Sequence, residues 1–96
     1  MAQFHPAAKQ EVEEAVEWYE NERHDLGKRF AQAVDEAIGR LERFPMWGTE
    51  IVPGIYRVLV KKFPYGVLYA IKDETLVVYA IAHLHRKPGY WRGRIC

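Results

Sequence analysis

The residues best suited to chemistry gather at the end of the chain. Residues 83–96 contain no acidic residue, and they interleave two histidines with four fixed cations, a tyrosine and a tryptophan. These residues are His83, His85, Arg86, Lys87, Tyr90, Trp91, Arg92 and Arg94. Cations attract phosphate groups and aromatic rings stack on bases, so this composition is typical of contact with RNA. Tyrosine, tryptophan and arginine are also the commonest anchors of protein interfaces. A third interpretation stays open, in which the aromatic rings pack against the end of a sheet and the cations keep the segment solvated.

Covalent catalysis has little support in this sequence. The chain contains no serine, which excludes every serine-nucleophile mechanism, and it has no Walker or GxGxxG loop. Its one cysteine, Cys96, is the last residue, where a well-positioned pair with histidine is not expected. A catalytic version of this chain would cleave phosphodiesters without a metal. Arginine and lysine would then stabilise charge, and histidine or tyrosine would move a proton.

The two histidines, His83 and His85, would share one face of a strand that continued through them. A histidine titrates near neutral pH, which suits a general acid or base, but an ordinary hydrogen-bonded histidine at a strand end is the simpler interpretation. No carboxylate is near them in the sequence, and Cys96 stands at no recognised zinc spacing. We therefore expect neither a metal nor another cofactor.

The charges are segregated along the chain, although they nearly cancel at a net +1. Residues 1–54 carry eleven acidic and six basic residues, whereas residues 55–96 carry eight basic and two acidic residues. If the two halves fold into different layers, the surface is segregated as well. The basic layer is then either a working surface or simply the electrostatic partner of the acidic layer.

The size of the chain predicts one domain over residues 1–96 with a modest core, since only 96 residues are present and 49% of them are hydrophobic. No apolar run approaches the roughly 18 residues that a membrane span requires. The first six residues lack the basic and apolar regions of a signal peptide. A lone cysteine excludes an internal disulfide. We therefore expect a cytoplasmic protein that does not contact a membrane.

Apolar spacing predicts two helices in the first half of the chain. One begins at Pro6 and continues to about Arg23, and the second runs from near Leu26 to the residues before Pro45. A solvated face of the first helix is expected at Glu11, Glu13, Glu14, Glu17 and Glu20. Because the link between the helices is short, they should form an antiparallel hairpin.

The second half of the chain has the composition of strands. Three runs rich in Val, Ile, Leu and Tyr, residues 55–62, 65–72 and 75–83, predict an antiparallel meander. Residues 2–4 could add a short edge strand, and residues 47–54 are interpreted as a connecting loop. The expected fold is a two-layer α+β domain, with the helical hairpin packed on a three- to four-stranded antiparallel sheet.

Alternation along residues 55–62 divides the first of these strands into two faces. The face expected to cover the helices carries Tyr56, Val58 and Val60. The opposite face carries Arg57, Leu59 and Lys61. The expected result is an electropositive sheet surface that is open to a larger partner.

Several segments, in this order and spacing, resemble one known family. They are Pro6-Ala7-Ala8, Trp18-Tyr19, Tyr56-Arg57-Val58-Leu59, the run from Phe63 to Tyr69, the run from Val77 to His83, and the run from Arg86 to Arg92. Together they make nearly the whole chain similar to the RelE/ParE superfamily of small bacterial toxins from type II toxin–antitoxin systems. The resemblance implies the fold expected above and a cognate antitoxin protein, one segment of which wraps and neutralises the toxin.

The superfamily divides by activity. RelE-like members cleave messenger RNA on the ribosome, whereas ParE-like members poison DNA gyrase. The resemblance places Arg57 and Arg86 near basic positions of the cleaving branch, and Tyr90 near its late acid or base. Gly66 stands where that branch carries an arginine, and Leu59 stands where another cation is expected. Cations or an imidazole that could compensate are Lys61, Lys62 and His83.

The resemblance therefore favours a ParE-like toxin that arrests growth by binding DNA gyrase, without catalysis. The alternatives are a RelE-like ribosome-dependent mRNA endoribonuclease that needs no metal, and a module without toxicity that only binds the antitoxin. The residues expected to contact the target are Arg57, Lys61, His85, Arg86, Lys87, Tyr90, Trp91 and Arg92. The catalytic residues of the nuclease alternative would be Arg57, His83, Arg86 and Tyr90. A hetero-oligomer of toxin and antitoxin is the expected assembly.

Overall fold

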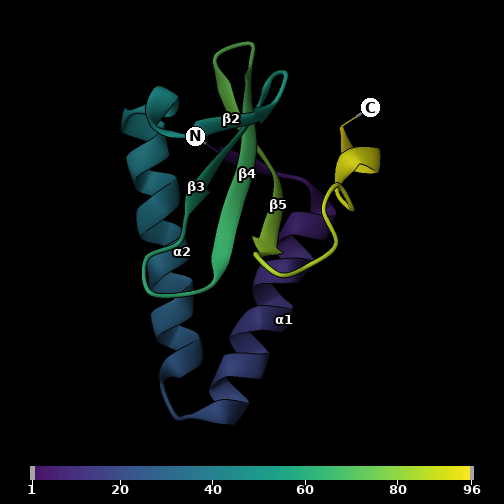
Figure 1. Cartoon of the computed structure of the whole chain (residues 1–96). Coiled ribbons are helices and arrows are strands. Elements are labelled where there is room, and N and C mark those ends of the chain that lie inside the picture. Colours follow the sequence, from purple (N-terminus) through teal and green to yellow (C-terminus); the bar gives the residue numbers. More distant parts are fainter. Residues whose placement is uncertain (1, 96) are drawn as a thin grey trace.

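The computed structural model describes residues 2–95. In chain order the elements are β1 (Ala2–Phe4), α1 (Pro6–Glu22), α2 (Leu26–Arg43), a 3-10 turn (Pro45–Trp47), β2 (Thr49–Val52), β3 (Ile55–Leu59), β4 (Tyr65–Lys72), β5 (Thr75–His83) and a second 3-10 turn (Arg92–Arg94). Both helices pack on one face of a single sheet (Figure 1). The predicted two-layer α+β fold is confirmed. Neither described helix is long and apolar enough to cross a membrane.

The start of α1 is set by two residues. His5 has an extended backbone, and its Nδ1 accepts a hydrogen bond from the Ala7 backbone N–H at 3.1 Å. Pro6 follows in the first turn, where the missing N–H would have no helical partner in any case. The His5 N–H donates to the Val78 carbonyl at 2.9 Å, so the helix begins against β5.

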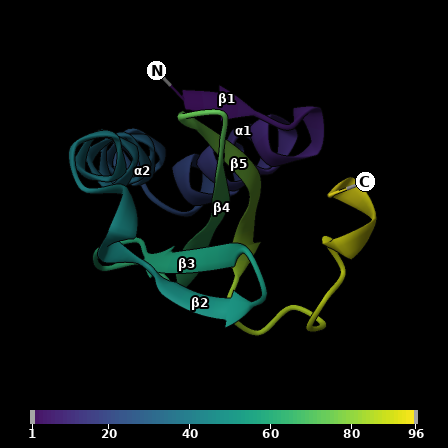
Figure 2. The ribbon, with the colours of Figure 1, turned by 90° about the horizontal axis from the view of Figure 1, so that it is seen from above.

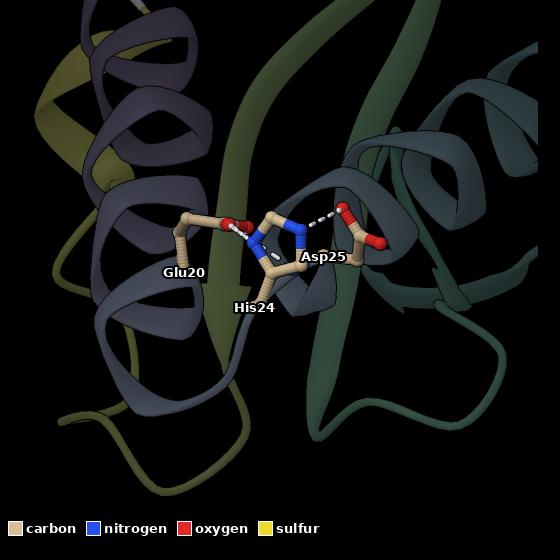
Figure 3. Close-up of side chains that lie close together, drawn as sticks. All are labelled: Glu20, His24 and Asp25. Carbon is tan, nitrogen blue, oxygen red and sulfur yellow. Dashed lines mark hydrogen bonds and ion pairs between the residues drawn. The ribbon is translucent and has the colours of Figure 1, made fainter.

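Glu20 closes the turn between the helices, where it lies beside His24 and Asp25 (Figure 3). Its carboxylate accepts hydrogen bonds from the backbone N–H groups of Asp25 at 3.0 Å and Gly27 at 3.1 Å. The hydrogen bond from Asp25 is the largest cause of a lowered Glu20 pKa. A Cβ at Gly27 would overlap the Val16 carbonyl oxygen, so glycine lets the two helices approach. The predicted antiparallel hairpin is confirmed.

The sheet differs from the prediction in size and direction. Within residues 2–95 it has five strands in the order β1-β5-β4-β3-β2, and β1 pairs with β5 in parallel while all other pairs are antiparallel. The expected three- to four-stranded antiparallel sheet is thus corrected to a five-stranded mixed sheet. Ala2–Phe4 runs parallel because it enters the sheet beside the last strand and leaves directly into α1.

The segment 47–54, expected to be a loop, contains β2. Thr49–Val52 turns back at Gly54, whose φ is +81°, and pairs with β3. Glu50 supports this turn by accepting the Gly54 N–H at 2.9 Å. A register shift between Glu50 and Val52 interrupts the alternation of side chains, which explains why the sequence pattern does not reveal this strand.

The strand expected over 55–62 ends earlier, at Leu59. The Val60 N–H donates to the Tyr65 carbonyl at 2.9 Å, and Lys62 has a φ of +69°, so the chain turns before it reaches Pro64. The expected faces of this strand are confirmed: Val58 is buried under the helices, and Arg57 is exposed on the other side.

Two hydrophobic clusters lie on opposite faces of the sheet. The larger one joins the helices to the sheet, and its most deeply buried members are Tyr69, Phe30, Leu41, Ile81, Val67 and Val78. The smaller one joins the C-terminal segment to the other face through Ile55, Leu68, Ala70, Tyr79, Ala80 and Trp91. Figure 2 shows this segment on the side of β4 and β5 away from α2. The sheet face expected to be open is therefore partly covered.

Candidate functional site

The C-terminal segment, residues 84–95, is anchored by Trp91. The indole of Trp91 is only 6% exposed and belongs to the smaller hydrophobic cluster. Trp91 was expected at a target surface, and the structure instead turns its ring inward. The neighbouring Arg92 stays exposed, with its guanidinium 5.7 Å from the centre of the Trp91 ring.

Glu11 of α1 holds the same segment from the helix side. Its carboxylate accepts hydrogen bonds from the Tyr90 hydroxyl at 2.7 Å and from both terminal nitrogens of Arg94, at 2.9 and 3.0 Å. Only 10% of the Glu11 side chain is exposed. The expectation that Glu11 belongs to the solvated face is wrong, because folding brings the cations of the C-terminal segment against this turn of the helix.

These contacts also complete an edge of the sheet. β1 pairs only with Leu76 to Val78, so on the edge of β5 away from β4 the residues after Val78 have no strand beside them within residues 2–95. The Ile81 N–H donates to Glu11 at 3.0 Å, and Arg94 donates to the Tyr79 carbonyl at 3.0 Å. An ion pair from two distant parts of the chain thus satisfies backbone groups that would otherwise lie unpaired and half-buried.

The environment of Tyr90 governs its chemistry. Burial is the largest cause of its raised pKa, and the hydrogen bond to Glu11 raises the pKa further. The Arg86 guanidinium stacks on its ring at 3.9 Å and lies 3.5 Å from Glu11. At neutral pH the phenol is protonated, and its proton is committed to Glu11. A general base at this position would need a free phenolate, which this arrangement disfavours.

Beside Tyr90 lies a cavity of about 270 Å³, called here the basic pocket. Its floor is apolar and includes Leu68, Ala82, Ile51 and Val52. Its polar lining consists of Arg57, His83, Arg86, Lys87, Tyr90 and Arg92. No described carboxylate lines it. The four residues expected for RNA cleavage, Arg57, His83, Arg86 and Tyr90, are therefore brought together from β3, β5 and the C-terminal segment.

Two glycines make room for the arginines of the basic pocket. A Cβ at Gly66 would lie 3.0 Å from Cδ of Arg57, so the arginine stem lies flat across β4. A Cβ at Gly89, whose φ is +78°, would lie 2.9 Å from Nε of Arg92. The sequence drew attention to Gly66 as a missing arginine, and the structure gives it a role in seating Arg57.

The remaining expected site residues lie elsewhere or serve local contacts. His83 Nδ1 accepts the His85 backbone N–H at 3.1 Å, and the two imidazole rings are 5.2 Å apart. His85 is exposed beside the basic pocket without lining it. Lys61 lies at a different site, against α2.

Potential metal ligands come together in one group of three within residues 2–95, at the helical turn: Glu20, His24 and Asp25 (Figure 3). All three side chains are exposed, and both Glu20 oxygens already accept backbone N–H groups. This group is accounted for as the cap of α2. Cys96, considered above as a ligand or nucleophile, lies outside the described residues.

A second concave surface, the α2 groove, runs between α2 and β3. It combines two cavities of about 520 and 360 Å³, which share Ala33, Glu36 and Lys61. Trp47 and Leu59, 42% and 56% exposed, lie at one end, and the Arg40 guanidinium lies 4.7 Å from the Trp47 ring centre. Exposed apolar residues rimmed by charge are typical of a protein interface.

Comparisons with known proteins identify the family and the fold of this chain. The family model described as the ParE toxin of type II toxin–antitoxin system, parDE, matches residues 2–88. A solved structure titled "Chromosomal ParDE TA system from P. aeruginosa" has the same fold, with a TM-score of 0.65 at 12% sequence identity. The match covers 88% of this chain and 95% of that one. No curated protein sequence gives a significant match. The chain belongs to the ParE toxin family of type II toxin–antitoxin systems.

Proposed function

We propose that this chain arrests bacterial growth by binding DNA gyrase, that it does so without catalysis, and that a cognate antitoxin neutralises it. Membership of the ParE family supports a toxin with an antitoxin partner. The observation that carries the non-catalytic part is the hydrogen bond of 2.7 Å from Tyr90 to Glu11. It engages the phenolic proton of Tyr90 in a contact with Glu11 and so disfavours Tyr90 as a general base.

The surface proposed to contact gyrase is the exposed cationic part of the C-terminal half. Arg57, Lys87 and Arg92 are exposed, and no carboxylate of residues 2–95 forms an ion pair with them. Unpaired exposed cations raise the rate of encounter with an acidic or nucleic-acid-bound partner. An intracellular target of this kind requires the chain to act in the cytoplasm.

Controlled expression tests the target. We expect growth arrest with an SOS response and double-strand DNA breaks, and the purified chain should inhibit supercoiling by gyrase. Arg92→Gln should weaken both effects, whereas Lys28→Gln, the same charge change at the start of α2, should leave them unchanged. Codon-phased breaks in messenger RNA would contradict this proposal and favour the endoribonuclease. Absence of growth arrest would favour a module that only binds the antitoxin.

The antitoxin is proposed to dock in the α2 groove. Trp47 and Leu59 offer apolar anchors, and Arg40 and Lys61 outnumber Glu36 along the lining, so an acidic amphipathic segment is complementary. This groove is formed by α2 and β3, whereas the basic pocket is lined by the C-terminal segment. Neutralisation would then act by binding at a second surface rather than by filling the basic pocket.

Leu59→Glu separates the two surfaces. Co-expressed with the product of the neighbouring reading frame, this variant should fail to co-purify with it and should keep its toxicity. Ile71→Glu is the matched control, because Ile71 is also an exposed apolar strand residue and lies outside the groove. Wild-type co-purification of Leu59→Glu would place the antitoxin elsewhere.

A further inference from the structure

The basic pocket is concave and cationic, which distinguishes it from an ordinary charged surface. Arg57, Arg86, Lys87 and Arg92 bring four fixed positive charges to a cavity of about 270 Å³, and no described carboxylate lines it. Glu11 approaches one of them, Arg86, at 3.5 Å, and Arg86 is still 54% exposed. We propose that the basic pocket binds a phosphate group of single-stranded nucleic acid, with the sugar or base of the same nucleotide on its apolar floor.

The lining favours phosphate over other anions. Arginine presents a planar fork of donors that matches the oxygens of a phosphate, and three arginines converge here. Four like charges around one small cavity repel one another, and a bound anion relieves this repulsion. Successive phosphates of a strand can engage cations on both sides of the pocket, whereas a single carboxylate brings one charge.

The arginines are seated before any ligand arrives. The stem of Arg57 lies over Gly66, and the Arg92 side chain folds back over Gly89, each in space that a Cβ would take. Arg86 is held by the Tyr90 ring at 3.9 Å. Preorganised side chains lose less conformational entropy on binding, so this arrangement favours an anion site over a chance collection of surface cations.

The apolar floor and the small volume of the pocket favour a single-stranded over a double-stranded nucleic acid. Ala82 and Val52 are half-buried and lie beneath the cations, with the buried Leu68 beside them, so an apolar surface is available to a base or sugar. The cavity, at about 270 Å³, is at the small end for ligand pockets and holds no more than one nucleotide. Bases of a duplex are stacked inside the helix, so an unpaired strand fits this site.

This inference rests on the proposed function, because the basic pocket is part of the surface proposed to contact gyrase. Phosphate binding is a property of the purified chain, so its test needs no gyrase. Failure of nucleotide binding with intact gyrase inhibition would remove only this inference. Binding of nucleotides without gyrase inhibition would remove only the gyrase proposal.

The test is equilibrium binding of a fluorescent oligothymidylate and an oligouridylate of about ten nucleotides to the purified full chain. We expect saturable binding that inorganic phosphate displaces and that weakens as salt rises, with a logarithmic slope of about −0.7 for each phosphate engaged. Binding of the deoxy strand or of the ribo strand supports the pocket, and the ratio of the two affinities tells which sugar it takes.

Variants locate the site. Arg57→Gln and Arg92→Gln should each weaken binding about tenfold, as expected for loss of one hydrogen-bonded charge. Lys28→Gln carries the same charge change outside the pocket and should change the affinity by about twofold or less. Equal losses in all three variants would indicate general attraction of charge and overturn the proposal.

Gly66→Ala tests geometry without changing charge. Its Cβ would meet the Arg57 stem at 3.0 Å and displace it, so we expect weaker binding with an unchanged far-ultraviolet spectrum and thermal midpoint within a few degrees. Wild-type affinity in a folded Gly66→Ala variant would contradict the claim that Gly66 positions Arg57 for binding. A glutamate-rich peptide that binds as tightly as the oligonucleotides, without competition from phosphate, would overturn the assignment of the ligand.

Discussion

At the scale of single residues, Glu11 is the side chain on which most of the arrangement depends. It joins α1, the free edge of β5 and the C-terminal segment through hydrogen bonds to Ile81, Tyr90 and Arg94. The partners come from parts of the sequence 70 or more residues away. Removing either partner of such a shielded ion pair leaves an uncompensated charge and lowers the stability of the fold.

Glu11→Gln should destabilise the fold by about 2 kcal/mol, since an amide can neither pair both nitrogens of Arg94 nor carry the compensating charge. Urea unfolding measures this loss, and faster amide exchange at Ile81 locates it. Glu13→Gln, on the exposed side of the same helix, should change the stability by no more than about 0.5 kcal/mol. Equal stability of the two variants would contradict the role given to Glu11.

Tyr90 carries a pH dependence of definite sign. Its pKa is raised in the folded chain, first by burial and then by the hydrogen bond to Glu11. The folded state therefore holds this proton more tightly than the unfolded state does. The corresponding stability is fully present below a pH of about 10, the ordinary tyrosine value, and is lost as the pH rises above it.

Tyr90→Phe should accordingly be less stable than the wild type at pH 8, because Glu11 loses a donor, and its stability should fall less steeply above a pH of about 10. Unfolding midpoints measured between pH 8 and 11 give the comparison. An alkaline decline as steep in Tyr90→Phe as in the wild type would assign that decline to Tyr19, Tyr65 and Tyr69, whose pKa values are also raised by burial.

At the scale of elements, two glycines of α2 have opposite effects on the stability of the helical hairpin. Gly27 lies in the first turn of α2 against the backbone of α1, with no room for a Cβ. Gly39 lies in the interior of the same helix, and a Cβ there would meet nothing within 4 Å. Gly27 is therefore required for steric reasons, whereas Gly39 only adds the entropic cost of a glycine inside a helix.

Gly39→Ala should stabilise the chain by about 0.5–1 kcal/mol, because alanine restricts the unfolded state and favours the helix. Gly27→Ala should destabilise it by about 1–3 kcal/mol, because the backbone of α1 has to move. Thermal unfolding of the two variants at neutral pH measures both. Shifts of the same sign would contradict the close approach of the helices at Gly27.

At the scale of the whole molecule, the described residues form one main core and one smaller hydrophobic cluster. Helices and sheet enclose the first, and the C-terminal segment closes the second around Trp91. The segment makes no strand pairing. It is attached by the burial of Trp91, by the contacts of Tyr90 and Arg94 with Glu11, and by single hydrogen bonds such as that from the Leu84 N–H to the Pro64 carbonyl. This arrangement predicts a region that opens more easily than the rest of the domain.

Trp91→Ala should release the C-terminal segment while the main core stays folded. We expect amide exchange over residues 84–95 to accelerate far more than exchange in β4, with a loss of about 3–5 kcal/mol in the stability of the segment's contacts. Hydrogen exchange followed by mass spectrometry resolves the two regions. Uniform acceleration over the whole chain would show that the two clusters unfold together.

Local patterns in the sequence predict most of the helices and strands, and they predict correctly which face of β3 is buried. The first helix, expected over about 6–23, is Pro6–Glu22, and the strands expected over 65–72 and 75–83 are β4 and β5. β2 and the parallel pairing of β1 are missed. A bulge in the register hides the periodicity of β2, and nothing within three residues shows which distant strand β1 will join.

The sequence by itself determined the helical hairpin, the strand faces and the gathering of cations near the end of the chain. These follow from the spacing of apolar and charged residues over a few turns of helix or steps of strand, which is a local property. Only the tertiary structure decided that Glu11 pairs with Arg94, that Trp91 is buried, and that Arg57 lies over a glycine. Those contacts join residues far apart in the sequence, and their energies exist only once the whole sheet has placed them within reach of one another.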